Sequence, residues 1–148
     1  MVVFEGTASP LSELDIDRVE RRLGIHLPQD LKEHYLVHNG GRPRPRFFIK
    51  GGEPYGVHEF LPMNTGDTSF EHSYVMLVVR TPEFPRGYLP FAYDEGGDYF
   101  LYSVKPESFG NIMFNQQDYY GDDERFVVFL APSLREFINS LTEEPDAL

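Results

Sequence analysis

Apolar residues in the first quarter of the chain recur with the period of an α-helix. The first stripe begins behind Ser12, which together with Asp15 three residues later matches a helix capping box. Gly24 ends this stripe, and Pro28 suits the first turn of a second helix because its missing N–H needs no partner there. The run Asn39-Gly40-Gly41 ends the second stripe. We therefore predict a helical hairpin with inward-facing residues at Ile16, Val19, Leu23, Leu31, Tyr35 and His38.

The next segments predict a loop followed by extended structure. Arg42–Arg46 alternates arginine with proline, which lacks a backbone N–H, and so predicts an extended loop. Strands are predicted at Arg46–Lys50 and Tyr55–Leu61, with Gly51-Gly52-Glu53-Pro54 as the turn between them. Ser69–Val79 combines apolar residues at helical spacing with β-branched valines, so helix and strand both stay open, and we favour the helix.

The second half of the chain predicts the main part of a sheet. Leu89–Tyr93 and Tyr99–Val104 flank Asp94-Glu95-Gly96-Gly97-Asp98, whose adjacent glycines suit a tight hairpin turn. Ile112–Phe114 adds a short strand. Phe126–Ala131 predicts a central strand because it is apolar on both faces.

A loop and a helix complete this pattern. Asn115–Glu124 is polar and aromatic and predicts a loop. Ser133 and Glu136 match a second capping box, behind which a helix would turn Leu134, Phe137, Ile138 and Leu141 inwards. We expect an α+β fold: a mainly antiparallel sheet of about five to six strands, with the N-terminal helical hairpin and the C-terminal helix packed on it. The 148 residues suit a single domain, with residues 1–11 and 142–148 flexible.

Composition adds limits on the class of protein. Apolar residues make up 41% of the chain and aromatic residues 15%, which argues against disorder. The absence of cysteine excludes disulfides, cysteine-ligated metals and thiol nucleophiles. The start of the chain lacks the basic and apolar pattern of a signal peptide, and the longest apolar runs, Tyr74–Val79 and Phe126–Ala131, are each six residues long. We therefore expect a cytoplasmic protein.

Charge is concentrated in one part of the chain. The formal net charge is −11, and residues 93–124 carry eight acidic groups and one basic group, a net of −7. Such a chain would repel a phosphate backbone, so direct nucleic-acid binding is disfavoured and a basic protein partner is favoured. Tyrosines beside carboxylates suit a protein interface, although an acidic loop can also serve solubility alone. The candidate partner-binding residues are Asp94, Glu95, Asp98, Asp118, Tyr119, Tyr120, Asp122, Asp123 and Glu124.

No motif for catalysis or a cofactor survives inspection. His34 and His38 lie four apart on the predicted second helix, but Tyr35 stands where a metalloprotease would have glutamate, and no third ligand can be placed. The carboxylates of the Asp94–Asp98 turn span five residues, too few for a calcium loop of about twelve. The glycine pairs lack the spacing of a phosphate loop. We expect no metal, no cofactor and no catalytic residue.

Three segments in order resemble the SUKH superfamily, which includes the fungal Smi-type cell-wall regulators and many small bacterial proteins. They are Leu23–Glu33 with the following Asn39-Gly40-Gly41, the hairpin Tyr88–Phe100, and the strand-to-helix step Ala131–Ile138. The likeness extends from about Ile16 to Leu141. The chain departs from typical members in its Arg42–Arg46 segment and in its long Asn115–Glu124 loop.

The resemblance implies an α+β fold and a function in binding rather than in chemistry. Many bacterial members are immunity proteins that bind and neutralise toxins, often nucleases. We therefore expect an immunity protein that covers a basic surface of its toxin. The alternatives are a regulatory or scaffold module that binds an endogenous protein, as the fungal relatives suggest, and a small-molecule enzyme with an unrecognised site.

Overall fold

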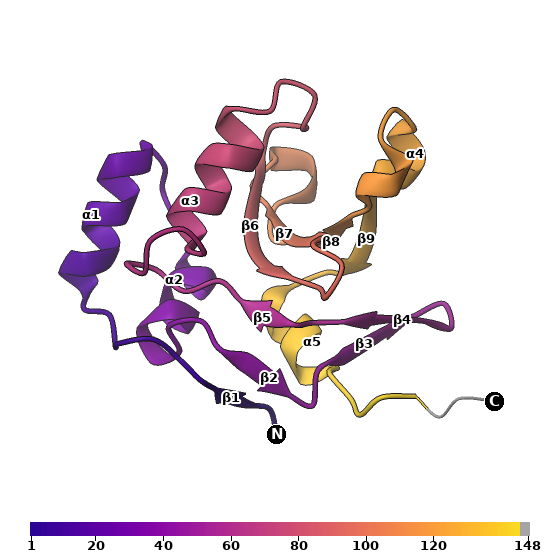
Figure 1. Ribbon diagram of the computed structural model, residues 1–148, viewed down its shortest axis with the longest axis horizontal. Coiled ribbons are helices and arrows are strands. Elements are labelled where there is room, and N and C mark those ends of the chain that lie inside the picture. The colour runs from indigo at the N-terminus through magenta and orange to yellow at the C-terminus, as the bar shows by residue number, and fades with distance from the viewer. Residues whose placement is uncertain (146–148) are drawn as a thin grey trace.

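A five-stranded antiparallel sheet forms the centre of the molecule. The computed structural model describes residues 1–145 (Figure 1). The sheet has the order β5-β6-β7-β8-β9, so each strand pairs with its neighbour along the chain. Its strands are β5 (Glu59–Phe60), β6 (Tyr88–Tyr93), β7 (Tyr99–Ser103), β8 (Ile112–Asn115) and β9 (Val127–Ala131). Together with the helices packed around it, this sheet confirms the predicted α+β class.

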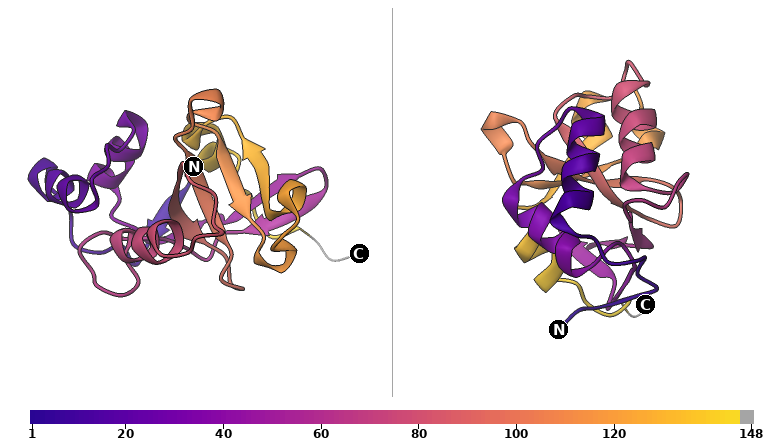
Figure 2. Two further views of the ribbon diagram at one scale, coloured as in Figure 1. Left: turned by 90° about the horizontal axis from the view of Figure 1, so that it is seen from above. Right: turned by 90° about the vertical axis from the view of Figure 1, so that its left-hand side faces the viewer.

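Alternate residues of the sheet enter two separate clusters of buried side chains. In β7, Phe100 and Tyr102 join the main core, whereas Leu101 points to the opposite face. The main core also holds residues of the N-terminal helices and of α5 (Leu134–Asn139), including Phe137. The smaller cluster includes Val78 of the π-helical segment η1 (Val75–Val79), which continues α3 (Phe70–Tyr74) beside the sheet (Figure 2). The sheet is therefore covered on both faces.

The N-terminal helical hairpin forms as its sequence predicts. It comprises α1 (Glu13–Leu23) and α2 (Gln29–Val37). The Asp15 amide donates to Ser12 Oγ at 3.1 Å, and the Ser12 amide donates to the Asp15 carboxylate at 2.8 Å, which completes the capping box. The Tyr35 hydroxyl donates to the carbonyl of Leu61 at 2.8 Å and fixes α2 beside the sheet.

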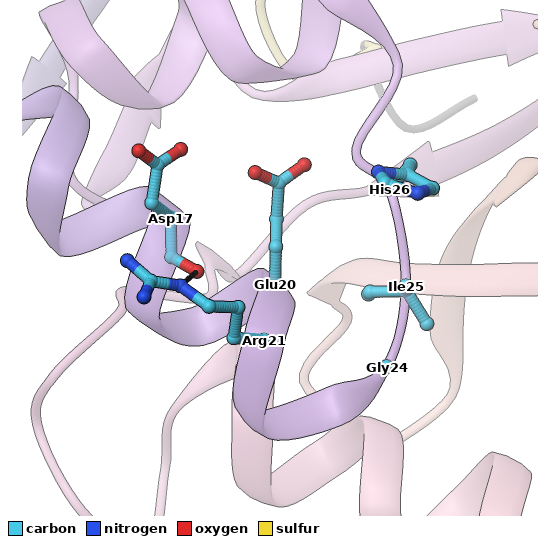
Figure 3. Close-up of a pocket in the computed structure, with 6 residues that line it drawn as sticks. All are labelled: Asp17, Glu20, Arg21, Gly24, Ile25 and His26. Carbon is cyan, nitrogen blue, oxygen red and sulfur yellow. Dashed lines mark hydrogen bonds between the residues drawn. The ribbon is translucent and has the colours of Figure 1, made fainter.

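The Glu20 carboxylate of α1 contacts both the connection between the two helices and α2 itself. Glu20 accepts a hydrogen bond from the Leu27 amide at 2.8 Å, and its second oxygen lies 3.7 Å from Lys32 Nζ. Glu20 lies beside Asp17 (Figure 3), and both line, together with His26, a hollow of about 360 Å³. Since both Glu20 oxygens have partners within the hairpin, this hollow has a structural explanation.

We expect Glu20→Ala to lower the free energy of unfolding by about 1–2 kcal/mol, because it removes a charge-assisted hydrogen bond and leaves the half-buried Leu27 amide unpaired. Urea denaturation measures this loss. The matched control is Glu33→Ala on the exposed face of α2, for which we expect a change within about 0.5 kcal/mol. Equal effects of the two substitutions would contradict the role assigned to Glu20.

The first residues of the chain and the arginine–proline segment correct two expectations. Residues 1–11 were expected to be flexible and Arg42–Arg46 to form a loop, but β1 (Val3–Glu5) pairs antiparallel with β2 (Arg42–Arg44). Arg44 also lies 3.3 Å from the Glu5 carboxylate. Proline is tolerated in β2 because this sheet has two strands, and an edge strand leaves one side without ladder bonds.

The connection from α2 to β2 packs closely against the segment before α1 and the segment after β5. Asn39 accepts a hydrogen bond from the Met63 amide at 2.7 Å and donates to the carbonyls of Ser9 and Met63. Gly40 has a φ of +74°, and a Cβ there would lie 2.8 Å from Pro62. Gly41 has a φ of +107° and would bring a Cβ within 2.8 Å of Thr7. Only glycine fits both positions.

The predicted hairpin at residues 46–61 divides between two sheets. β3 (Phe47–Lys50) pairs with β4 (Glu53–Gly56) as a separate two-stranded sheet, and the turn is shorter than predicted. The remaining part of Tyr55–Leu61 forms β5, which pairs with β6 instead. At the other end of the chain, Thr142 exchanges backbone hydrogen bonds of 2.8 and 3.0 Å with Phe47. Of the tail expected to be flexible, residues 146–148 lie outside the described residues.

One further prediction is corrected in the sheet, and the helix favoured for Ser69–Val79 is confirmed. The strand predicted to be central, Phe126–Ala131, forms β9 at one edge of the sheet. Its outward-facing Phe129 is 40% exposed and lies beneath Lys50 Nζ at 4.9 Å, so a cation rather than a neighbouring strand covers the ring. Ser69 caps α3 as predicted, but Val75–Val79 widens into a π-helix, in which the Arg80 amide bonds the Val75 carbonyl.

Candidate functional site

The acidic turn between β6 and β7 is held by its own first carboxylate. Asp94 Oδ1 accepts hydrogen bonds from the amides of Gly96 at 3.0 Å and Asp98 at 2.8 Å. The Asp94 amide donates in turn to the Asp98 carbonyl at 2.9 Å. Asp94 therefore shapes the turn, while Glu95 at its tip remains exposed.

The second acidic segment is more ordered than the predicted loop Asn115–Glu124. It contains a 3₁₀ turn at Gln117–Tyr119 and the short helix α4 (Asp123–Phe126). The Asp122 carboxylate caps α4 by accepting from the amides of Glu124 at 3.2 Å and Arg125 at 3.3 Å. Asp122 thus has a structural function, whereas Asp118, Asp123 and Glu124 present exposed side chains.

Gln117 joins the two acidic segments into one surface. Its backbone amide donates to the Asp98 carboxylate at 3.2 Å, and its side-chain amide donates to the Gly97 carbonyl at 2.8 Å. The pKa of Asp98 is raised above its usual value. Partial burial is the largest cause, and the carboxylates of Asp94 and Asp118 add to it, while the hydrogen bond from the Gln117 amide opposes it. Three of the candidate carboxylates therefore lie close enough to repel one another. We call the surface formed by residues 94–98 and 117–124 the acidic face.

Two arginines that sequence reasoning did not select offset part of this charge. Arg46, which precedes β3, forms an ion pair with Glu95, and Arg125 lies 3.6 Å from the Asp122 carboxylate. The Arg125 guanidinium also lies over the Tyr119 ring at 5.3 Å. The pairing of Arg46 with Glu95 could not be read from the sequence, because the two residues are 49 positions apart.

The two adjacent tyrosines of the acidic face point into different surroundings. Tyr119 is 39% exposed and borders a hollow of about 440 Å³ shared with Asp94, Arg125 and the strand β4. Tyr120 is 61% exposed and packs edge-on against Phe126 at a ring distance of 6.0 Å. Carboxylates, exposed aromatic rings and hollows between them are features of protein-binding surfaces.

The histidine pair of α2 lies away from this face, among aromatic rings. His34 and His38 are 5.4 Å apart between ring centroids, and Phe4 of β1 lies 5.2 and 4.6 Å from them. Burial lowers the pKa of His34 to about 4, and the neighbouring His38 adds to this shift. Within residues 1–145, no three histidine or acidic side chains group as they would around a metal ion.

The fold and the acidic face together define a class: an α+β domain in which two acidic segments, with exposed carboxylates and tyrosines, are joined into one face beside an antiparallel sheet. A family model, that of the SMI1 / KNR4 family (SUKH-1), matches residues 10–140. The chain belongs to this family, as the three sequence segments indicated. The family has immunity and regulatory roles, and its members are generally non-catalytic domains that bind proteins.

Two other findings complete the comparison. No curated protein matches the chain significantly. Within the described residues 1–145, no helix has both the length and the apolar character needed to cross a bilayer.

Proposed function

We propose that this protein is a cytoplasmic bacterial immunity protein that neutralises a toxin by binding it. The observation that supports this proposal is the joining of the two acidic segments by Gln117 into one face. Membership of a family with immunity roles adds to it. Inhibition requires no chemistry, because a stoichiometric partner that covers the active surface of an enzyme excludes the substrate.

The chemistry of the acidic face suits a toxin that acts on nucleic acid. A nuclease binds the phosphate backbone with lysine and arginine side chains. Carboxylates spaced like phosphates can form ion pairs with the same side chains. Charge of opposite sign speeds the encounter and sets the orientation of the two proteins. Tyr119 and Tyr120 supply apolar area at a low entropic cost among these charges. A face of about 800 Å² on each partner is sufficient for tight binding.

The test reverses charge without disturbing the fold. The cognate toxin is first captured from cells with the tagged protein and identified by mass spectrometry. We expect the triple variant Asp118→Lys, Asp123→Lys, Glu124→Lys to associate with it at least about tenfold more slowly, with a weaker dependence on salt. Stopped-flow kinetics at several salt concentrations measures both. Asp122 is left unchanged because it caps α4.

The control carries the same change in net charge on other surfaces. Glu13, Glu33 and Glu107 are exposed and lie outside the acidic face, and their replacement by lysine also adds six charges. We expect this control to change association much less than the triple variant. If both variants associate as fast as the unmodified protein, the acidic face does not bind the toxin and the proposal fails.

A further inference from the structure

A second hollow, of about 290 Å³, opens beside the acidic face where the end of η1 meets the start of the Asn115–Glu124 segment. Leu77, Phe84 and Phe126 form apolar walls, and Tyr120 stands at its rim. The rings of Phe84 and Phe126 meet edge to face at 6.0 Å. The hollow is thus lined mainly by rings and aliphatic carbon, above the smaller of the two hydrophobic clusters.

One of the residues that line this hollow carries a buried polar atom without a partner among the described residues. Asn115 is fully buried, and its side-chain N–H donates to the Phe126 carbonyl at 3.3 Å. Its Oδ1 accepts no hydrogen bond from any described residue. Nearly all buried side-chain oxygens in proteins have a partner, so an unpaired amide oxygen at an apolar hollow indicates a place for a donor from outside the chain. The Thr81 hydroxyl, also in the lining, already donates to the Met76 carbonyl at 2.8 Å.

The combination selects one kind of side chain. An aliphatic or phenylalanine side chain would fill the space but leave Asn115 Oδ1 unpaired. A lysine or arginine head would bring a full charge into an apolar site that offers it a neutral oxygen, at a high desolvation cost. A tryptophan side chain has a large apolar body and a single N–H donor, which matches the walls and the unpaired acceptor of Asn115.

The acidic residues around the rim of the hollow indicate which residues would flank that tryptophan in its own chain. Partial desolvation raises the pKa of Tyr120, and the nearby Glu83 carboxylate raises it further, so Glu83 lies beside the rim tyrosine. On the same segment, Asp118 precedes Tyr120, and Asp122 and Asp123 follow it. A tryptophan that enters here would therefore be flanked best by lysine or arginine.

We propose that this hollow is an anchor pocket for a tryptophan side chain in a basic segment of the partner. The inference deepens the proposed function and rests on it, since it names the residue of the toxin that the acidic face positions. Buried aromatic residues surrounded by polar contacts commonly dominate the affinity of protein interfaces.

The test needs no toxin, because the chain contains no tryptophan and a peptide can supply the fluorescence signal. The probe is acetyl-Lys-Lys-Trp-Lys-Lys-amide, excited where tyrosine does not absorb. We expect saturable binding of this peptide with a blue-shifted emission. The same peptide with Leu in place of Trp is expected to bind at least about tenfold more weakly, as measured by its competition with the Trp peptide. Replacing the indole N–H by N-methyl removes the donor and is expected to weaken binding about tenfold on the unmodified protein.

Two variants and a matched control locate the binding. Asn115→Leu removes the acceptor, and Thr81→Phe fills the hollow from another element, so the test does not depend on one variant folding. Tyr119→Ala is the control, because Tyr119 borders the other hollow while its neighbour Tyr120 borders this one. We expect the first two to abolish the preference for the Trp peptide over the Leu peptide, and the control to keep it.

The outcomes separate this proposal from the function on which it rests. If the Trp and Leu peptides bind equally, or if both Asn115→Leu and Thr81→Phe keep the preference, the anchor pocket is disproved. The charge-reversal kinetics with the toxin would be unaffected by that result. Conversely, a toxin that associates normally with the triple lysine variant would disprove the acidic face as the binding site, even where the peptide binds the pocket.

Discussion

Phe137→Ala is expected to lower the free energy of unfolding by about 3–5 kcal/mol, a large part of the roughly 5–15 kcal/mol that stabilises a domain. Phe137 is fully buried in α5 and is the side chain that ties this helix to the sheet. Its ring lies 5.5 and 5.9 Å from those of Phe100 and Phe91 and stacks on Phe48 at 5.2 Å. Alanine would leave a cavity that three elements border.

Chemical denaturation followed by circular dichroism measures this loss. Phe137→Leu fills part of the cavity and is expected to fall between alanine and the unmodified protein. The matched control is Phe109→Ala, because Phe109 is 59% exposed and its removal is expected to change stability by less than about 1 kcal/mol. A similar loss for the two alanine variants would contradict the assignment of Phe137 to the centre of the core.

Acidification is expected to destabilise the protein through His34. The pKa of this group is about 4 in the folded state, against 6.5 in the unfolded chain. Above pH 6.5 the imidazole is neutral in both states and its contribution is complete. Between pH 6.5 and 4 only the unfolded state binds the proton, so stability falls by roughly 3 kcal/mol, and below pH 4 this group causes no further change.

Urea midpoints measured from pH 7.5 to 4 test this expectation. His34→Leu cannot titrate, so its stability is expected to fall less over this range than that of the unmodified protein. His26→Gln is the control, since His26 is exposed and lies at the turn between the helices. The groups that face His34 are Phe4, Phe60, Tyr35 and His38, and burial also lowers the pKa of His38. Identical pH profiles for His34→Leu and the unmodified protein would contradict the prediction.

Local signals in the sequence made it possible to predict the helices α1, α2, α3 and α5. Ser12, Ser69 and Ser133 each accept a hydrogen bond from an amide three residues later, as the sequence pattern requires. The hairpin of β6 and β7 was equally accessible, because its turn residues follow one another in the chain. These features depend on neighbours in sequence, and their physics is complete within a few residues.

The pairing of strands depends on contacts that the pattern of apolar residues does not specify. Apolar residues on both faces of β9 indicate that both faces are covered, not that a strand lies on each side. The residues Arg42–Arg44 carry no strand signal because two of the three are arginine, yet β1 brings Phe4 against Pro43. Register between segments far apart in sequence is set by the packing of the whole core.

The candidate site, like the fold, could be predicted from the sequence only in part. Charge counting found both halves of the acidic face, and the structure places them together through Gln117, a neutral residue without a distinctive signal. Charge counting could not show that the carboxylates of Asp94 and Asp122 accept hydrogen bonds from backbone amides. It also missed Asn115, since an unpaired buried oxygen is visible only once the surrounding atoms are placed.

The close packing at Asn39, Gly40 and Gly41 has a consequence for how such a protein can diverge. These residues carry part of the family resemblance, and each is required by a backbone contact on the side of α2 and β5. The acidic face is built from other residues, in the turn between β6 and β7 and in the segment that follows β8. Selection for a new partner can therefore alter residues 117–124 while the glycines stay fixed, so that descendants of one scaffold would keep a common signature and recognise unrelated partners.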